Sequence, residues 1–77
     1  MKEIIPMMSD EQLVKHNFTY HPPKEGQSEK YETLRSIAKN LAIHILWNCP
    51  PSRERSLAQT KLEEAIFWAN ASIARNE

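Results

Sequence analysis

The loop FTYHPPKEGQ, which runs over 18–27, gathers the residue types best suited to hold a flat ligand. Phe18, Tyr20 and His21 supply three rings, and two prolines and the chain's single glycine follow them. Aromatic rings stack on nucleobases, and prolines restrict the freedom of the unfolded chain. The segment is therefore either a rigid ligand-binding loop or a lid over the end of a small core, and its composition leaves both interpretations open.

Cationic and amide side chains near such a loop would complete a site for a small anionic ligand. Lys30 and Arg35 follow the loop, and Asn70 and Arg75 stand near the end of the chain. Arginine and lysine bind phosphate through charge-assisted hydrogen bonds, while rings stack on bases. If the fold brings these residues to Tyr20, they suit a nucleotide. The ordinary role of Arg35 and Arg75 is a surface salt bridge.

No set of residues in the sequence is typical of catalysis or of a bound metal or cofactor. Glu63 and Glu64 are adjacent, so their carboxylates diverge on a helix, and there is no glycine-rich phosphate loop. Cys49 is the single cysteine and adjoins two prolines in a turn. His44 has no second metal ligand four residues further on, so we expect a buried, hydrogen-bonded histidine. The sequence predicts a binding protein that is not an enzyme and uses no cofactor.

One short helix and two long helices must position these residues within a single helical domain of residues 1–77. In the N-terminal segment 1–17, Ser9 and Gln12 have the spacing of a capping box, which predicts a short helix over 10–16. The loop follows this segment, and the strongest helical pattern begins directly after the loop.

Long helices are expected over 28–48 and 52–75, because the turn NCPPS between them cannot continue a helix. Their apolar residues recur at helical spacing. The predicted stripes are Leu34, Ile37, Ala38, Leu41 and Ile45, and then Ala58, Leu62, Ala65, Ile66, Ala69 and Ile73. Because the turn is short, we expect the two helices to be antiparallel neighbours, with Arg35 near Ala65. The end of this hairpin that lies far from the turn then collects the loop and the candidate cations.

The apolar residues exceed what a two-helix hairpin covers. In the segments LAIHILW and AIFWANASIA nearly every residue is apolar. A helix that is apolar on all sides is buried on more than one side, and small proteins most simply achieve this by symmetric self-association. We therefore expect a homo-oligomer, with Trp47 and Trp68 as anchors of a core or an interface.

Charge and hydropathy argue against two other classes of partner. Ten basic and ten acidic residues cancel, whereas a binder of long nucleic acid normally carries a basic excess. No apolar run approaches the roughly 20 residues of a membrane span, and none has the pattern of a signal peptide. A lone free cysteine without an export signal indicates the cytoplasm.

The chain resembles the small phage anti-CBASS sponge proteins. The segments that carry the resemblance are, in order, F-x-Y-H-P-P, G-Q, Y-x-x-L-R, C-P and L-E-x-A-x-x-W-A-N-A-x-I-A-R, of which WANASIAR is the most distinctive. The resemblance runs from about Phe18 to Arg75. It implies a compact helical hexamer without catalytic activity, which sequesters the cyclic oligonucleotides of CBASS immunity in the cytoplasm of the infected bacterial host.

The resemblance also implies two kinds of pocket, one for cyclic dinucleotides and one for cyclic trinucleotides. In the first, Tyr20 would stack on a base with His21 beside it, and a basic residue early in the long helix would contact phosphate. Arg35 is the first choice for that basic residue, and the alternatives are Lys30 and Lys39. For the trinucleotide pocket the implied residues are Arg75 and Asn70.

A helical adaptor is the alternative function. Such a protein would bind a host or phage protein through its exposed apolar surface, and it would share the lack of catalytic groups. A sponge is expected to be thermally stabilised by a cyclic dinucleotide, and an adaptor is not.

Overall fold

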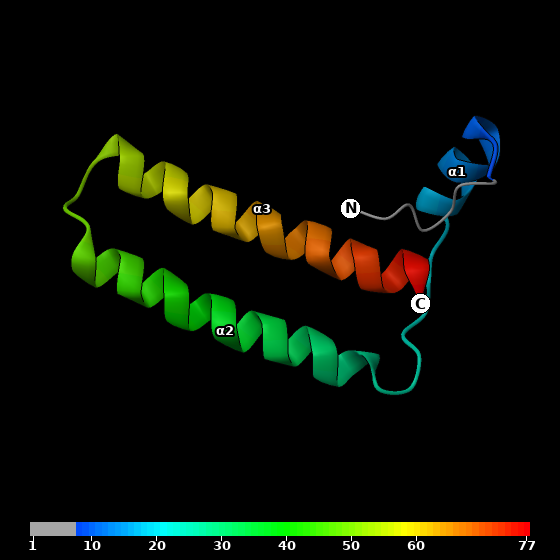
Figure 1. The fold of residues 1–77 in the computed structure, drawn as a ribbon, viewed down its shortest axis with the longest axis horizontal. Helices are drawn as coiled ribbons and strands as arrows, with labels where there is room; N and C mark the ends of the chain where they lie inside the picture. The colour runs from blue at the N-terminus through cyan, green and yellow to red at the C-terminus, as the bar shows by residue number, and fades with distance from the viewer. Residues whose placement is uncertain (1–7) are drawn as a thin grey trace.

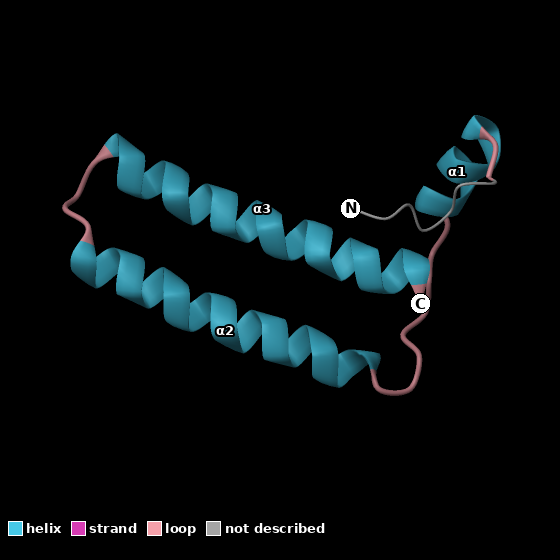
Figure 2. Ribbon diagram, viewed as in Figure 1, coloured by secondary structure: helices cyan, strands magenta, loops and turns pink. Residues whose placement is uncertain are grey.

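The computed structural model describes residues 8–77 and shows three helices joined by loops (Figures 1 and 2). Helix α1 spans Asp10–Asn17, α2 spans Gln27–Asn48 and α3 spans Arg53–Asn76, and this part of the chain contains no strand. The long helices α2 and α3 form an antiparallel hairpin, and α1 lies at its open end beside the last turn of α3 (Figure 1). The predicted all-α fold is confirmed. Residues 1–7 of the expected N-terminal segment lie outside the described part of the chain.

Local sequence determines where each helix begins and ends. Ser9 Oγ accepts a hydrogen bond from the Gln12 amide at 3.2 Å, and Gln12 Oε1 accepts one from the Ser9 amide at 3.0 Å, which completes the predicted capping box of α1. Ser52 Oγ accepts from the Arg55 amide at 3.1 Å and so caps α3. Helix α2 ends where Cys49 becomes extended, because the proline that follows disfavours helical backbone in the residue before it.

Two inter-helix hydrogen bonds fix the register of the hairpin. Gln59 Nε2 donates to the carbonyl of Ala42 at 2.9 Å near the turn, and Gln27 Nε2 donates to the carbonyl of Ile73 at 3.4 Å at the open end. The half-buried apolar residues of the seam include Leu34, Ala38, Ile45, Leu62, Ile66, Ala69 and Ile73. The antiparallel pairing expected from the short turn is therefore present.

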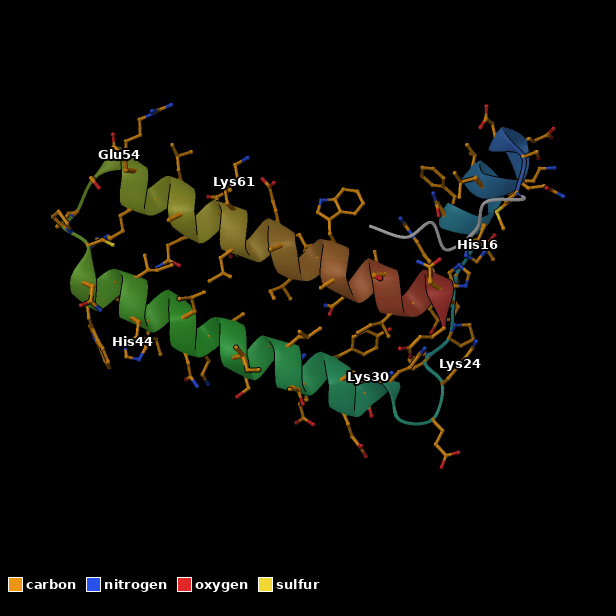
Figure 3. All side chains as sticks on the ribbon, viewed as in Figure 1. His16, Lys24, Lys30, His44, Glu54 and Lys61 are labelled. Atoms are coloured by element: carbon orange, nitrogen blue, oxygen red, sulfur yellow. The ribbon has the colours of Figure 1, made fainter. Side chains whose placement is uncertain are left out.

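The apolar stripes predicted for α2 and α3 are wider than the surface that each helix buries against the other. Ile37, Leu41 and Ala65 are exposed, because a single facing helix covers only the positions that point at it. The prediction of a buried His44 is wrong for the single chain for the same reason. His44 is exposed on α2 (Figure 3). Its ring meets that of Trp47 edge-on, with the ring centroids 5.4 Å apart.

The hairpin leaves much of its apolar surface open. No hydrophobic residue between positions 8 and 77 is fully buried in the single chain, and the side chains of Trp47 and Trp68 are 72% and 67% exposed. The radius of gyration is 15.8 Å, whereas a compact domain of this length has about 11–12 Å. Neither tryptophan belongs to a core within one protomer. None of the three helices has the length and hydropathy that crossing a membrane requires.

Candidate ligand-binding pocket

A pocket of about 550 Å³ lies at the open end of the hairpin. The loop and the end of α1 form one wall, the first turns of α2 form the second, and the last turns of α3 form the third. Its lining residues are Asn17, Thr19, Tyr20, His21, Tyr31, Arg35, Phe67, Asn70, Ala71, Ala74 and Arg75. Rings and guanidinium groups from three different segments thus surround one space.

Five of the seven predicted site residues line this pocket: Tyr20, His21, Arg35, Asn70 and Arg75. The antiparallel hairpin explains why these residues lie together. The start of α2 and the end of α3 are about equally far from the turn in sequence, so they lie side by side at the open end. The dinucleotide residues implied by the resemblance therefore lie beside the trinucleotide residues in the same protomer. The remaining two predicted residues lie elsewhere.

Lys30 points to the end of α3 and not into the pocket (Figure 3). Its Nζ lies 2.5 Å from Glu77 Oε2, and Lys24 Nζ donates to the main-chain carbonyl of the same glutamate. The hydrogen bond from Lys30 holds the pKa of the Glu77 carboxyl below its ordinary value, and a hydrogen bond from Gln27 adds to the effect. This lysine is therefore engaged in an ion pair, as the ordinary reading of a surface cation predicts.

Lys39 lines a second cavity, of about 650 Å³, further along the groove between α2 and α3. The cavity is bounded mainly by apolar side chains such as Leu62 and Ile66, and Tyr20 does not line it. Arg35 and Asn70 border both spaces. Of the three cations named for the cyclic dinucleotide phosphate, Arg35 alone shares a pocket with Tyr20.

The arginines of the pocket have no carboxylate partner among residues 8–77. The salt bridges of this part of the chain all use lysines. Arg75 donates from Nη2 to the carbonyl of Asn17 at 3.4 Å, which is a neutral acceptor. An anion that enters the pocket therefore meets two guanidinium groups that are not already neutralised, Arg35 and Arg75.

Asn70 carries a buried acceptor that has no partner within the described residues. Its Oδ1 is shielded from solvent and accepts no hydrogen bond there, although the residue as a whole is half-buried. An unpartnered buried acceptor costs about 1–3 kcal/mol, so such atoms usually face a ligand, a water or a second subunit. Asn70 lines both the pocket and the second cavity.

Tyr20 extends into the open, since its side chain is 78% exposed, and Phe18 nearby is 88% exposed. Within one chain these rings do not cover a core. The hypothesis that the loop is a lid over the end of a small core is therefore wrong for the single protomer. His21 is half-buried and is held by a 2.8 Å hydrogen bond between its Nε2 and the carbonyl of His16. Within the loop, His21 is therefore held by a hydrogen bond, and the ring of Tyr20 is exposed at the pocket.

Sequence reasoning missed several lining residues. Tyr31 lies one helical turn before Arg35 on α2, and that spacing places both side chains on one face, so the signal was available. Thr19 lies inside the loop and is fastened by a 2.5 Å hydrogen bond from its Oγ1 to the carbonyl of Lys15. Phe67 belongs to an apolar segment that the sequence predicts to form an interface. Only the three-dimensional structure shows that it also lines the pocket.

A family model of known proteins matches most of the chain. The family model of the Acb2/Tad1 hairpin domain matches residues 10–74, which include α1, the loop and nearly all of the hairpin. Neither the curated proteins nor the solved structures contain a significant match. The matched region exceeds half of the chain and confirms the resemblance described above. The chain belongs to the Acb2/Tad1 family of anti-CBASS sponges, which are binding proteins that sequester cyclic oligonucleotides and not enzymes.

Proposed function

We propose that this protein binds cyclic dinucleotides and cyclic trinucleotides stoichiometrically and releases them intact. The observation that carries the proposal is the pocket at the open end of the hairpin, where the exposed ring of Tyr20 stands beside two arginines without carboxylate partners among residues 8–77. A cyclic oligonucleotide offers the two matching groups, a flat base for the ring and a phosphodiester for a guanidinium.

For a cyclic dinucleotide, Tyr20 stacks on one base, His21 lies beside it and Arg35 contacts phosphate. The first turns of α2 support this division of roles, because Tyr31 and Arg35 reach the same wall of the pocket. For a cyclic trinucleotide, Arg75 contacts phosphate, and Asn70 accepts a hydrogen bond from a base through its unpartnered Oδ1. Lys30 is a weaker candidate because Glu77 already neutralises it.

Self-association completes the proposal. The exposed apolar side chains on both long helices, Ile37 and Leu41 on α2 and Phe67 and Trp68 on α3, support a homo-oligomer. The family resemblance suggests a hexamer. Phe67 and Arg75 border both the pocket and the neighbouring exposed surface around Trp68, so a second copy packed on that surface would enclose the ligand.

Sequestration requires tight binding and an excess of protein, and it requires no turnover. A dissociation constant of 1 nM corresponds to about −12.3 kcal/mol, which stacking, phosphate contacts and exclusion of water would have to supply together. We place this activity in the cytoplasm of the infected bacterial host, where the CBASS messengers act.

A thermal-shift panel tests the function directly. Cyclic di-AMP, cyclic di-GMP, cyclic GMP–AMP and cyclic tri-AMP are added to the full-length protein, with linear dinucleotides and AMP as controls. We expect stabilisation by cyclic ligands that the linear controls do not give. If no cyclic ligand stabilises the protein, the adaptor function replaces the sponge, because the exposed apolar surface suits a protein partner equally well. Linear product recovered from denatured complexes would instead show a nuclease.

A further inference from the structure

The most buried side chain in residues 8–77 is a polar one, that of Gln27, which is 3% exposed. This inverts the usual order of burial, since glutamine is mostly exposed in folded proteins, whereas here every apolar residue among 8–77 is half-buried or exposed. A buried amide is costly unless its donor and acceptor are both satisfied. Its burial at the first position of α2 therefore calls for a specific set of partners.

Gln27 has those partners, and they come from two other segments. Its Oε1 accepts a hydrogen bond from the Lys24 amide at 2.9 Å, which fastens the loop. Its Nε2 donates to the carbonyl of Ile73 and to Glu77 Oε1, both at 3.4 Å, which fastens the last turn of α3. One side chain thus joins the loop, the start of α2 and the end of α3.

On its N-terminal side, the part of the loop that carries Tyr20 is attached to α1 through Thr19, which donates from Oγ1 to the carbonyl of Lys15 and from its amide to the carbonyl of His16. His21 is held on one side by the carbonyl of His16, and the two prolines that follow lack an amide hydrogen. The next attachments to the rest of the chain are those of Lys24 and Gln27. The position of the tyrosine relative to α3 is therefore determined by an anchor on each side of it.

Gln27 also sets the direction in which the first turns of α2 face. Tyr31 and Arg35 follow it at intervals of four residues, so the three side chains lie along one face of the helix. Hydrogen bonds from the Gln27 amide to α3 hold that face toward the pocket that Tyr31 and Arg35 line.

From this arrangement we propose that Gln27 is a positioning residue for the ligand pocket. It holds the loop that bears Tyr20, and the helical face that bears Arg35, at a fixed separation from the wall formed by α3. It does not line the pocket and does not touch the ligand. The inference depends on the proposed function, because it concerns the geometry in which a cyclic oligonucleotide is bound.

The test compares Gln27→Met with a matched control, Gln59→Met. Both variants remove a glutamine that donates to a main-chain carbonyl across the hairpin, but Gln59 lies near the turn and not at the open end.

Amide hydrogen exchange is measured without ligand for residues 18–26, and calorimetry measures the affinity for cyclic GMP–AMP and cyclic tri-AMP. We expect Gln27→Met to accelerate amide exchange in residues 18–26. We also expect it to lower the affinity for whichever cyclic nucleotide the wild type binds by about tenfold. Gln59→Met is expected to change neither quantity.

Rescue separates positioning from general destabilisation. Gln27→Glu keeps the acceptor for the Lys24 amide but removes the donor and places a carboxylate against Glu77. Adding Glu77→Gln restores a hydrogen bond between the two side chains, but the side chain at position 77 now donates and the side chain at position 27 accepts. We expect Gln27→Glu to bind as weakly as Gln27→Met, and the double variant to regain part of the affinity. The glutamate variants also serve as the test if Gln27→Met fails to fold.

Each outcome has a definite meaning. Wild-type affinity in Gln27→Met, or an affinity loss without faster exchange in 18–26, overturns the positioning role. An equal loss of affinity in Gln59→Met does so too, since any weakening of the hairpin would then suffice. If the wild type binds neither probe, the proposed function fails instead. In that case the exchange data still show whether Gln27 fastens the loop.

Discussion

The guanidinium of Arg75 donates a hydrogen bond of 3.4 Å to the carbonyl of Asn17, which joins the last turn of α3 to the last residue of α1. The link is reciprocal, because the carbonyl of Arg75 lies 2.6 Å from Nε2 of His16, one residue before Asn17. Two helix C-termini therefore meet at one arginine, whose positive charge is favourable beside their exposed carbonyls. Arg75 both supports the wall formed by α1 and offers a cation to the pocket.

Arg75→Ala should weaken cyclic trinucleotide binding by about tenfold and leave cyclic dinucleotide binding largely intact, because the two ligand classes are expected to use different cations. Calorimetry with cyclic tri-AMP and cyclic GMP–AMP measures both affinities. Arg55→Ala is the matched control, since Arg55 also donates to main-chain carbonyls, those of Leu46 and Cys49, but at the opposite end of the hairpin. Equal losses for both ligands would show that Arg75 acts through α1 or serves a single shared site.

Gly26→Ala should destabilise the chain by about 1–2 kcal/mol, the cost of left-handed backbone for a residue with a β-carbon. Gly26 has φ 84° in the turn that leads into α2, and an added β-carbon would meet open space. The effect is therefore conformational and not steric. Gly26→Asn should cost less, because asparagine tolerates this region better. Denaturant unfolding of both variants provides the comparison, and equal stability of Gly26→Ala and wild type would contradict it.

The sequence predicts the helix boundaries well because caps and prolines act locally. The serines at 9 and 52 and the turn NCPPS each determine an end through their nearest neighbours. The same holds for the general location of the pocket, since an antiparallel hairpin necessarily returns α3 to the start of α2. These features depend on a few adjacent residues and on one turn.

The remaining features depend on packing that no local pattern encodes. Gln27 at the start of a helix looks like an ordinary exposed residue, and only the position of the last turn of α3 buries it. Lys30 and Arg35 are indistinguishable as cations in sequence, and Glu77 separates them by pairing with the lysine. His44 is predicted to be buried because its neighbours are apolar, but one facing helix leaves that side of α2 open.

Acidification should remove the stabilising contribution of Glu77. The pKa of its carboxyl is lowered from the ordinary value of 4.5, chiefly by the hydrogen bond from Lys30. A group whose pKa is depressed in the folded chain contributes stability above its unfolded pKa, and that contribution is lost as the pH falls through the folded pKa. The difference in unfolding free energy between wild type and Glu77→Gln should therefore shrink below pH 4.5. Lys30→Met should show a weaker pH dependence than wild type over the same range. A difference that stays constant with pH would contradict the prediction.

Trp68→Ala should reduce the oligomeric mass. The side chain is 67% exposed in the single chain, so its truncation removes little packing within a protomer and acts mainly on contacts between copies. Truncating a tryptophan that an interface buries costs on the order of 3–5 kcal/mol. Light scattering should give the wild type a mass several times 9.0 kDa and the variant a smaller one. A wild-type protein that is a monodisperse folded monomer would remove the basis for enclosing the ligand between copies.

Tyr20→Ala should weaken cyclic dinucleotide binding by roughly tenfold or more and leave cyclic trinucleotide binding largely intact. Stacking on an aromatic side chain is worth about 1–3 kcal/mol per base, and each 1.4 kcal/mol is tenfold in affinity. The ring is exposed at the pocket, and no hydrogen bond within residues 8–77 uses its hydroxyl, so Tyr20→Phe should bind like wild type.

Phe18→Ala is the matched control for the tyrosine. Phe18 lies two residues earlier in the same loop and is even more exposed than Tyr20, but it does not line the pocket. Its truncation should leave both affinities and the oligomeric mass unchanged. Calorimetry on the three variants with cyclic GMP–AMP and cyclic tri-AMP distinguishes a specific stacking contact from a general effect of loop composition. If Tyr20→Ala binds the dinucleotide like wild type, the exposed ring serves the packing of copies and another group must hold the base.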